Sequence, residues 1–131
     1  MDKASTELIK GYLDKAAQKL QVAEQLLQQQ SFDDAVSRAY YAAFHAAHAM
    51  LLSEGLTAQT HRGLLNLFGL HFVKSGKVSK EMGGYLSNLK DDRETGDYEA
   101  FSAIDEETAR NAVQEAQAFI KEAKTYLHKI S

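Results

Sequence analysis

Five polar side chains that could take part in chemistry lie within a short stretch of this sequence. They are Ser37, Arg38, Tyr41, His45 and His48. An α-helix turns about 100° per residue, so in a helix these five side chains point within roughly 100° of one another. The residues between them are apolar, which predicts one polar stripe along an otherwise apolar helix. Because arginine, tyrosine and histidine offer hydrogen-bond donors, the stripe is suited to line a site for a small anionic ligand.

The same stripe is open to other interpretations. Buried polar side chains are normally hydrogen-bonded, so Arg38 is equally well explained as the partner of a carboxylate on another helix. A lone histidine on a core-facing helix is more often simply hydrogen-bonded than functional. His45 and His48 are three residues apart, but no carboxylate shares their face, so we expect no metal site. The chain has no cysteine, which excludes thiolate metal sites, and we expect no cofactor.

A second polar segment, residues 93–98 (RETGDY), lies near the point where the helical pattern breaks. The guanidinium of Arg93 stays charged and can bind two phosphate oxygens at once, which makes it a candidate anion-binding group. The hydroxyl of Tyr98 has an ordinary pKa of about 10, so it suits hydrogen bonding or modification better than general-base work. The alternative is a capped loop in which Arg93 and Asp97 form a weak surface ion pair.

Five helical segments are predicted to position these residues, because apolar residues recur at three- and four-residue steps in each. They span residues 5–30, 33–53, 60–74, 79 to about 93, and 105–129. We expect Thr60 and Ser79 to cap the third and fourth helices, and Gly55 to end the second. The predicted fold class is all-α, an up-and-down four-helix-type bundle with an additional short helix.

The segment 33–53 is predicted to be the central and most buried helix, because two of its three sectors are apolar. One sector is made of small residues, which let a neighbouring helix approach closely: Ala39, Ala42, Ala43, Ala46 and Ala49. The other apolar sector is bulkier: Val36, Tyr40, Phe44, Ala47 and Leu51. The polar stripe forms the third sector. We expect it to face the segment 93–98, with Arg38 buried against Asp97 or Asp92.

Length and charge narrow the class of protein. A chain of 131 residues fits one domain, expected over residues 1–131. The net charge of −3 argues against broad, sequence-independent binding to DNA or RNA, which needs a basic surface. No signal peptide or membrane-spanning stretch is recognisable, so we expect a cytoplasmic protein that does not contact a membrane.

Four short motifs, in order along the chain, resemble one branch of a known family. Residues 37–44 (SRAYYAAF) resemble its opening motif, and residues 60–63 (THRG) resemble its Thr-His-x-Gly turn. Residues 72–76 (FVKSG) are similar to its Phe-Val-Lys-x-Gly helix end, and residues 93–98 to its Arg-x-x-x-Asp-Tyr element. The family is HEPN (higher eukaryotes and prokaryotes nucleotide-binding), in its small bacterial and archaeal branch, and the resemblance covers nearly the whole chain.

The resemblance implies a helical bundle that forms a homodimer and is often encoded beside a minimal nucleotidyltransferase, as a toxin–antitoxin pair. Many HEPN proteins are metal-independent ribonucleases, with an arginine and a following histidine separated by four to six residues. Here Tyr98 stands where that histidine would be. In some relatives the partner adenylylates a tyrosine beside the motif, and Tyr98 is the matching position. We also expect a homodimer because the last helix carries a long apolar stripe.

Three functions follow as hypotheses, and whether the chain is an enzyme stays open. The first is a HEPN component of a toxin–antitoxin or regulatory pair with a nucleotidyltransferase, which binds nucleotide or RNA or is adenylylated. The second is a metal-independent ribonuclease that uses Arg93 with Tyr98, His45 or His61. The third is a nucleotide-binding module without catalysis. The candidate ligand-binding residues are Arg38, Tyr41, His45 and Asp97, and the candidate catalytic pair is Arg93 and Tyr98.

Overall fold

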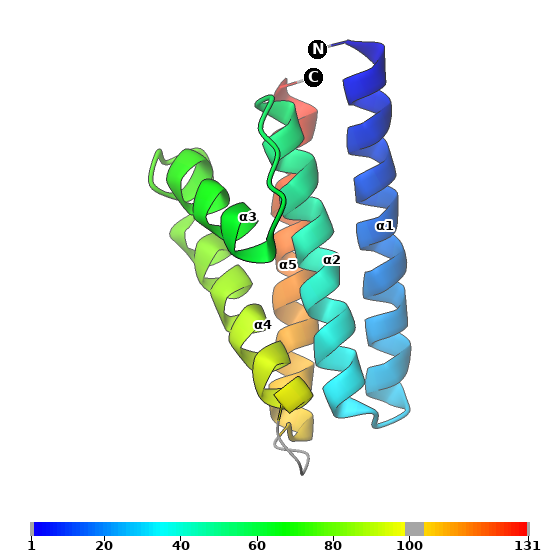
Figure 1. Ribbon diagram of the computed structural model, residues 1–131. Helices are drawn as coiled ribbons and strands as arrows, with labels where there is room; N and C mark the ends of the chain where they lie inside the picture. The colour runs from blue at the N-terminus through cyan, green and yellow to red at the C-terminus, as the bar shows by residue number, and fades with distance from the viewer. Residues whose placement is uncertain (1, 99–103, 131) are drawn as a thin grey trace.

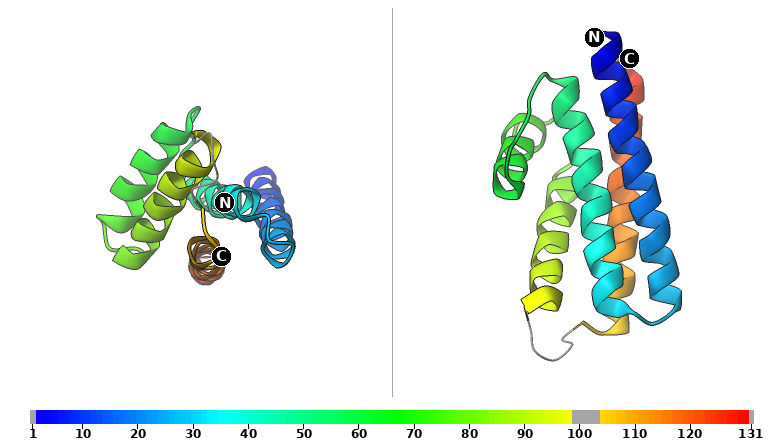
Figure 2. Two further views of the ribbon diagram at one scale, coloured as in Figure 1. Left: turned by 90° about the horizontal axis from the view of Figure 1, so that it is seen from below. Right: turned by 45° about the vertical axis from the view of Figure 1, so that its right-hand side comes forward.

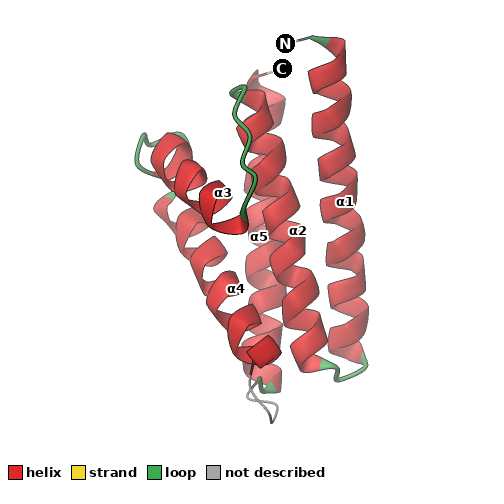
Figure 3. Ribbon diagram, in the orientation of Figure 1, coloured by secondary structure: helices red, strands yellow, loops and turns green. Residues whose placement is uncertain are grey.

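The computed structural model describes residues 2–98 and 104–130, and helices are the only regular secondary structure in these ranges (Figure 3). Five α-helices and one π-helical segment follow one another along the chain. They are α1 (Lys3–Gln28), α2 (Phe32–Ser53), α3 (His61–Phe68), η1 (Gly69–Val73), α4 (Lys80–Tyr98) and α5 (Glu106–Ile130). The predicted all-α class, with long helices and an additional short one, is confirmed.

The helices surround α2. Helices α1 and α5 run alongside it, and α4 leans across its other side with α3 packed beyond (Figure 1). Seen along the bundle, α2 lies in the centre, between α1 on one side and α4 on the other (Figure 2). Because α2 contacts α1, α3, α4 and α5, its sequence must satisfy several different neighbours at once.

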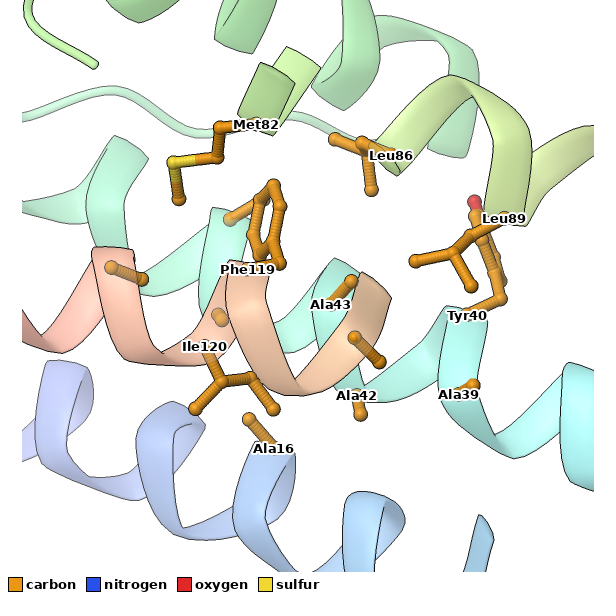
Figure 4. Packing of buried hydrophobic residues seen from close by; sticks show 14 of the residues in the cluster. Ala16, Ala39, Tyr40, Ala42, Ala43, Met82, Leu86, Leu89, Phe119 and Ile120 are labelled. Atoms are coloured by element: carbon orange, nitrogen blue, oxygen red, sulfur yellow. The ribbon is translucent and has the colours of Figure 1, made fainter. Parts of the chain in front are cut away.

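The small-residue sector of α2 forms the middle of the core. Ala39, Ala42, Ala43 and Ala46 are all fully buried, which confirms the prediction that this helix lies at the centre. Around them the neighbouring helices contribute larger side chains. Figure 4 shows Ile120 of α5 facing Ala16 of α1, and Phe119 of α5 lying beside Met82 and Leu86 of α4. Small residues on α2 therefore leave room for bulky residues from the helices around it.

The apolar stripe of α5 is buried inside the chain. Its members are Ala109, Ala112, Val113, Ala116, Phe119, Ile120, Ala123 and Leu127. They are covered by α1, α2 and α4 of the same molecule. The stripe therefore leaves no surplus apolar surface for a second copy, and the homodimer predicted from it loses this part of its support.

The predicted helix caps are present. Thr60 Oγ1 accepts a hydrogen bond of 2.9 Å from the backbone N–H of Gly63, and Ser79 Oγ accepts one of 3.2 Å from that of Met82. Gly55 has a φ of +72°, a left-handed conformation that follows the end of α2. The Thr60 cap has a functional consequence, because it fixes the start of α3 and with it the position of His61.

The predicted break after Arg93 is wrong, because α4 continues to Tyr98. Side chains one turn apart hold this stretch in a helix: Arg93 pairs with Asp97, and Lys90 pairs with Glu94 at 3.3 Å. Gly96 lies within this helix, at the point where the end of α4 meets the start of α2. A Cβ at this position would lie 3.4 Å from Ile104 and 3.6 Å from Asp33, which are ordinary packing distances, so this contact does not itself require glycine.

Candidate functional site

The guanidinium of Arg93 lies over two tyrosine rings of α2. Its central carbon is 5.2 Å from the ring centroid of Tyr40 and 5.1 Å from that of Tyr41. Each contact places a cation on the face of an aromatic ring, which is worth about 0.5–2 kcal/mol depending on burial. Tyr40 is fully buried and Tyr41 is half-buried. The two rings therefore hold the guanidinium in one orientation at the surface of the bundle.

The hydrogen-bonding capacity of Arg93 is largely unused. Its Nε lies 3.2 Å from Asp97 Oδ2, but this nitrogen is buried and has no partner in hydrogen-bonding geometry. The contact is thus an ion pair without a hydrogen bond, and since the Asp97 side chain is 40% exposed it contributes about 1 kcal/mol at most. Among the described residues no acceptor takes an N–H of Arg93. The donors that normally grip a phosphate or carboxylate remain available.

His61, at the start of α3, joins the same cluster. Its Nδ1 lies 2.9 Å from the hydroxyl of Tyr40. The imidazole stacks on Phe44, with ring centroids 4.2 Å apart, and meets the edge of Tyr41 at 5.7 Å. Arg93 and His61 therefore contact the same two tyrosines, although they lie on different helices and far apart in the sequence.

Burial favours the neutral forms of Tyr40 and His61. It raises the pKa of Tyr40 to about 12, and the positive charge of Arg93 only partly opposes this effect. Burial also lowers the pKa of His61, and Arg93 lowers it further. At neutral pH the phenol is thus protonated and the imidazole is neutral. Arg93 is the charge around which these neutral aromatic side chains are arranged.

A groove between α3 and α4 opens beside this cluster. It encloses about 670 Å³ and is lined by His61, Arg62 and Lys90, together with Asp91 and Glu94. The ion pair of Lys90 with Glu94 neutralises part of this lining, whereas Arg62 is exposed. The groove is large enough for a small ligand, and its lining carries two cations and two carboxylates beside the cluster formed by Tyr40, Tyr41, His61 and Arg93.

The other end of the predicted stripe lies on the α1 side of α2. The ring of Tyr12 on α1 stacks on His48 at 4.2 Å and lies 6.1 Å from His45. Burial lowers the pKa of His45 to about 4, helped by Lys15 and Lys19, and its Nδ1 has no hydrogen-bond partner. Burial also lowers the pKa of His48. Tyr41 connects the two ends, since its ring lies 6.4 Å from that of His45.

Arg38 does not lie where the helical pattern predicted. It is exposed and pairs with neither Asp97 nor Asp92, so the expectation of a buried ion pair is wrong. Asp97 pairs with Arg93 instead. Asp92 lines a separate groove of about 610 Å³ between α4 and α5, where burial and nearby Glu115 raise its pKa. The polar stripe does reach α4 as predicted, but through Tyr41.

Other candidate residues are placed as follows. Tyr98 ends α4, and its side chain lies outside the described part of the structure. Tyr40, predicted to belong to the apolar sector of α2, also has a polar role, because its hydroxyl is hydrogen-bonded to His61. A tyrosine at a fully buried position was the available signal, since a buried hydroxyl needs a partner. Within the described ranges no three His, Asp or Glu side chains gather closely enough for a metal, and no helix there is long and apolar enough to cross a membrane.

Comparison with known proteins gives the chain its family. The family model described as HEPN domain matches residues 9–126. A Thermotoga maritima protein named "UPF0332 protein" is 35% identical over 114 residues, which are 87% of this chain and 86% of that protein. A Methanocaldococcus jannaschii protein named "Putative toxin MJ0605" is 33% identical over 130 residues, which are 99% of this chain and 96% of that protein.

A solved structure supports the fold. The crystal structure of TT1696 from Thermus thermophilus superposes with a TM-score of 0.76 and covers 90% of this chain and 97% of that chain. Its sequence identity is 18%, so this likeness concerns the arrangement of helices alone. The family model and the two relatives span most of the chain, including α2 and the Arg93 segment. The chain therefore belongs to the HEPN family.

Proposed function

We propose that the Arg93 cluster binds the phosphate of a nucleotide or of RNA, within a HEPN protein that acts in a toxin–antitoxin or regulatory pair. The cluster is defined as Tyr40, Tyr41, His61 and Arg93. The observation that supports this most is the state of Arg93, which two rings hold in place while its donors stay unpaired. An arginine serving only stability would be expected to use those donors within the fold.

Phosphate is the anion that suits this cluster. A guanidinium can bind two phosphate oxygens at once, and its orientation is already fixed here, which lowers the entropic cost of binding. Exposed Arg38, on the same side of α2 as Tyr41, is available for a second phosphate.

The partner in this proposal is a minimal nucleotidyltransferase, and Tyr98 is the group it would modify. In that reaction the tyrosine oxygen attacks the α-phosphorus of ATP, the phenol loses its proton and pyrophosphate leaves. The new phosphodiester would add a negative charge near the helical turn that carries Arg93. Support comes from the position of Tyr98 at the end of α4, the helix that also carries Arg93. A toxin-like role is supported by the name of the Methanocaldococcus relative.

Ribonuclease activity is the second candidate. It is favoured by one observation, the contact of Arg93 and His61 with the same tyrosines, which supplies an arginine and a histidine in one cluster. In this case Arg93 would stabilise the charge on the phosphate and His61 would transfer a proton. The two candidates differ in what they require of His61.

One experiment separates the candidates. Wild type, Arg93→Ala, His61→Ala and Tyr98→Phe are incubated with labelled RNA, and separately with labelled ATP and the cognate nucleotidyltransferase. We expect weak or no RNA cleavage, label transfer that Tyr98→Phe abolishes, and RNA or nucleotide binding that Arg93→Ala abolishes. Robust cleavage that is lost in Arg93→Ala and His61→Ala would favour the ribonuclease instead. Binding that survives Arg93→Ala would exclude the proposed site.

A homodimer forms part of the proposal. Its support is the half-buried aromatic surface of α2 and α1, which Tyr12, Tyr41, Phe44 and His48 form in the isolated chain. A second copy covering this surface would bring two Arg93 clusters to one cleft. Light scattering should give twice the chain mass for wild type and the single mass for Phe44→Asp. A monomeric wild type at micromolar concentration would contradict the dimer.

A further inference from the structure

The buried hydroxyl of Tyr40 determines which nitrogen of His61 carries a proton. Tyr40 is fully buried, and its hydroxyl lies 2.9 Å from His61 Nδ1. No other described residue is hydrogen-bonded to this hydroxyl. If Nδ1 carried a proton and donated it to the oxygen, the hydroxyl hydrogen would be buried without an acceptor, which is unfavourable. Tyr40 therefore donates, and Nδ1 accepts with its lone pair.

A neutral imidazole carries its single proton on one nitrogen, so the proton of His61 is on Nε2. The doubly protonated ring is disfavoured at this position. It would turn Nδ1 into a donor facing the phenol, and it would place a second positive charge beside Arg93, which already lowers the pKa of His61 together with burial. Phe44 and Tyr41, which also pack on the ring, carry no negative charge that would offset this effect.

The Nε2–H group is left free at the edge of the groove. None of the described residues is hydrogen-bonded to Nε2, and this atom is not sequestered from solvent as Arg93 Nε is. Stacking on Phe44 at 4.2 Å keeps the ring in place, and His61 lines the groove between α3 and α4. A fixed neutral donor thus lies in the same cluster as a fixed cation.

We propose that His61 binds a phosphate oxygen through its Nε2–H group, and that Tyr40 is a positioning residue that holds the proton on Nε2. This role rests on the proposed phosphate site at Arg93 and adds a second group to it. In this tautomer Nε2 has no free lone pair, so His61 is a donor and not a general base. The cluster is then built to hold a phosphate rather than to deprotonate a ribose hydroxyl.

Two substitutions distinguish a donor from a base. The amide nitrogen of Gln reaches the place of Nε2, so His61→Gln keeps a donor there, whereas His61→Phe keeps the ring stacking and removes the donor. With ADP as the probe, we expect His61→Phe to bind about tenfold more weakly or worse and His61→Gln to stay within about threefold of wild type. A 5′-hydroxyl oligoribonucleotide in a parallel titration shows whether an internal phosphodiester is bound in the same way as a terminal phosphate.

The role of Tyr40 has its own spectroscopic test. Histidine ¹⁵N spectra at neutral pH report the tautomer directly, and the His61 signals are assigned by their loss in His61→Gln. We expect the Nε2–H form in wild type and a mixture of tautomers in Tyr40→Phe, which keeps the shape of the ring. Tyr85→Phe, on α4 in the other groove, is the matched control and should leave the His61 signals unchanged. A wild-type Nδ1–H form would overturn the proposal.

Arg93→Gln tests the phosphate site at Arg93 separately from the donor role of His61. If it binds ADP and the oligoribonucleotide as tightly as wild type, the phosphate site at Arg93 is itself wrong. If it loses binding while His61→Phe does not, the site stands and the donor role of His61 is wrong. Loss of ADP binding in His61→Gln as well as in His61→Phe would also overturn the donor role, because the amide donor is retained.

Discussion

Helix α2 presents two faces of opposite character. The alanine face, Ala39, Ala42, Ala43 and Ala46, is fully buried and has no polar side-chain atom. The aromatic face, Tyr41, Phe44, His45 and His48, is half-buried along its length. On this second face and next to it, His45 Nδ1 and Arg93 Nε are buried without hydrogen-bond partners. Helix α2 thus has one face without polar side-chain atoms and another face where buried polar atoms lack hydrogen-bond partners.

The alanine face of α2 stabilises the fold, whereas the aromatic face is the candidate for function. Alanine side chains let the neighbouring helices approach closely, and they bring no polar group that needs a partner. The aromatic face holds polar atoms away from water without satisfying all of them, which lowers stability. Buried polar atoms without hydrogen-bond partners are tolerated most readily at a site where a ligand or a partner supplies the missing contacts. Three predictions compare the two faces, beginning with the largest effect.

Ala42→Leu tests the alanine face. The added atoms have no space, because Ala42 is fully buried where α2 meets its neighbours. We expect the free energy of unfolding to fall by about 3 kcal/mol, measured by urea denaturation. Ala17→Leu on the exposed side of α1 is the matched control and should change it by less than about 0.5 kcal/mol. Equal effects of the two substitutions would remove the distinction between the faces.

Acid tests the aromatic face through His45. In the unfolded chain this histidine takes up a proton near pH 6.5, whereas in the folded chain its pKa is lowered to about 4. The unfolded state therefore binds more protons between these values, and stability falls as the pH drops from 6.5 to 4. Allowing for solvent screening, we expect a loss of about 2 kcal/mol that is clearly smaller in His45→Phe. An identical pH dependence in both proteins would show that His45 is not desolvated.

Tyr40→Phe tests the hydrogen bond to His61, where the two faces of α2 meet. It should lower the free energy of unfolding by about 1 kcal/mol, as removal of one hydrogen bond typically does. Tyr85→Phe is the control, because among the described residues its hydroxyl has no hydrogen-bond partner. If the two phenylalanine variants are equally stable, the bond of 2.9 Å between Tyr40 and His61 contributes nothing measurable.

Periodicity and capping residues predicted most of the fold. The alanine sector, the Thr60 and Ser79 caps and the stop at Gly55 are local features that sequence spacing encodes directly. The end of α4 was harder to predict from the sequence, because a glycine such as Gly96 ordinarily disfavours a helix. The helix continues through this glycine because α4 packs against α2 and α5, which lie elsewhere in the sequence. Tertiary packing outweighs helix propensity at that position.

The candidate site was less predictable, because its geometry combines three helices. The angles of a helix correctly predicted that Tyr41 lies on the face that meets α4. They also predicted that Arg38 is buried, whereas its side chain is exposed. Helical periodicity says which residues share a face and does not say which edge of that face the neighbours cover. The bond between Tyr40 and His61 joins α2 to α3, and sequence spacing carries no information about that distance.

The most direct test of the account compares two arginines that form similar helical ion pairs. Arg93 pairs with Asp97 and also lies over two rings, whereas Arg110 pairs with Glu106 at 2.7 Å on the exposed side of α5. Arg93→Gln and Arg110→Gln are titrated with ADP and oligoribonucleotide, and their unfolding free energies are measured in the same buffer. We predict that Arg93→Gln weakens binding at least about tenfold with a stability loss of about 1 kcal/mol, and that Arg110→Gln changes neither appreciably. Unchanged binding in Arg93→Gln, with a large loss of stability, would contradict the account and make Arg93 a structural residue.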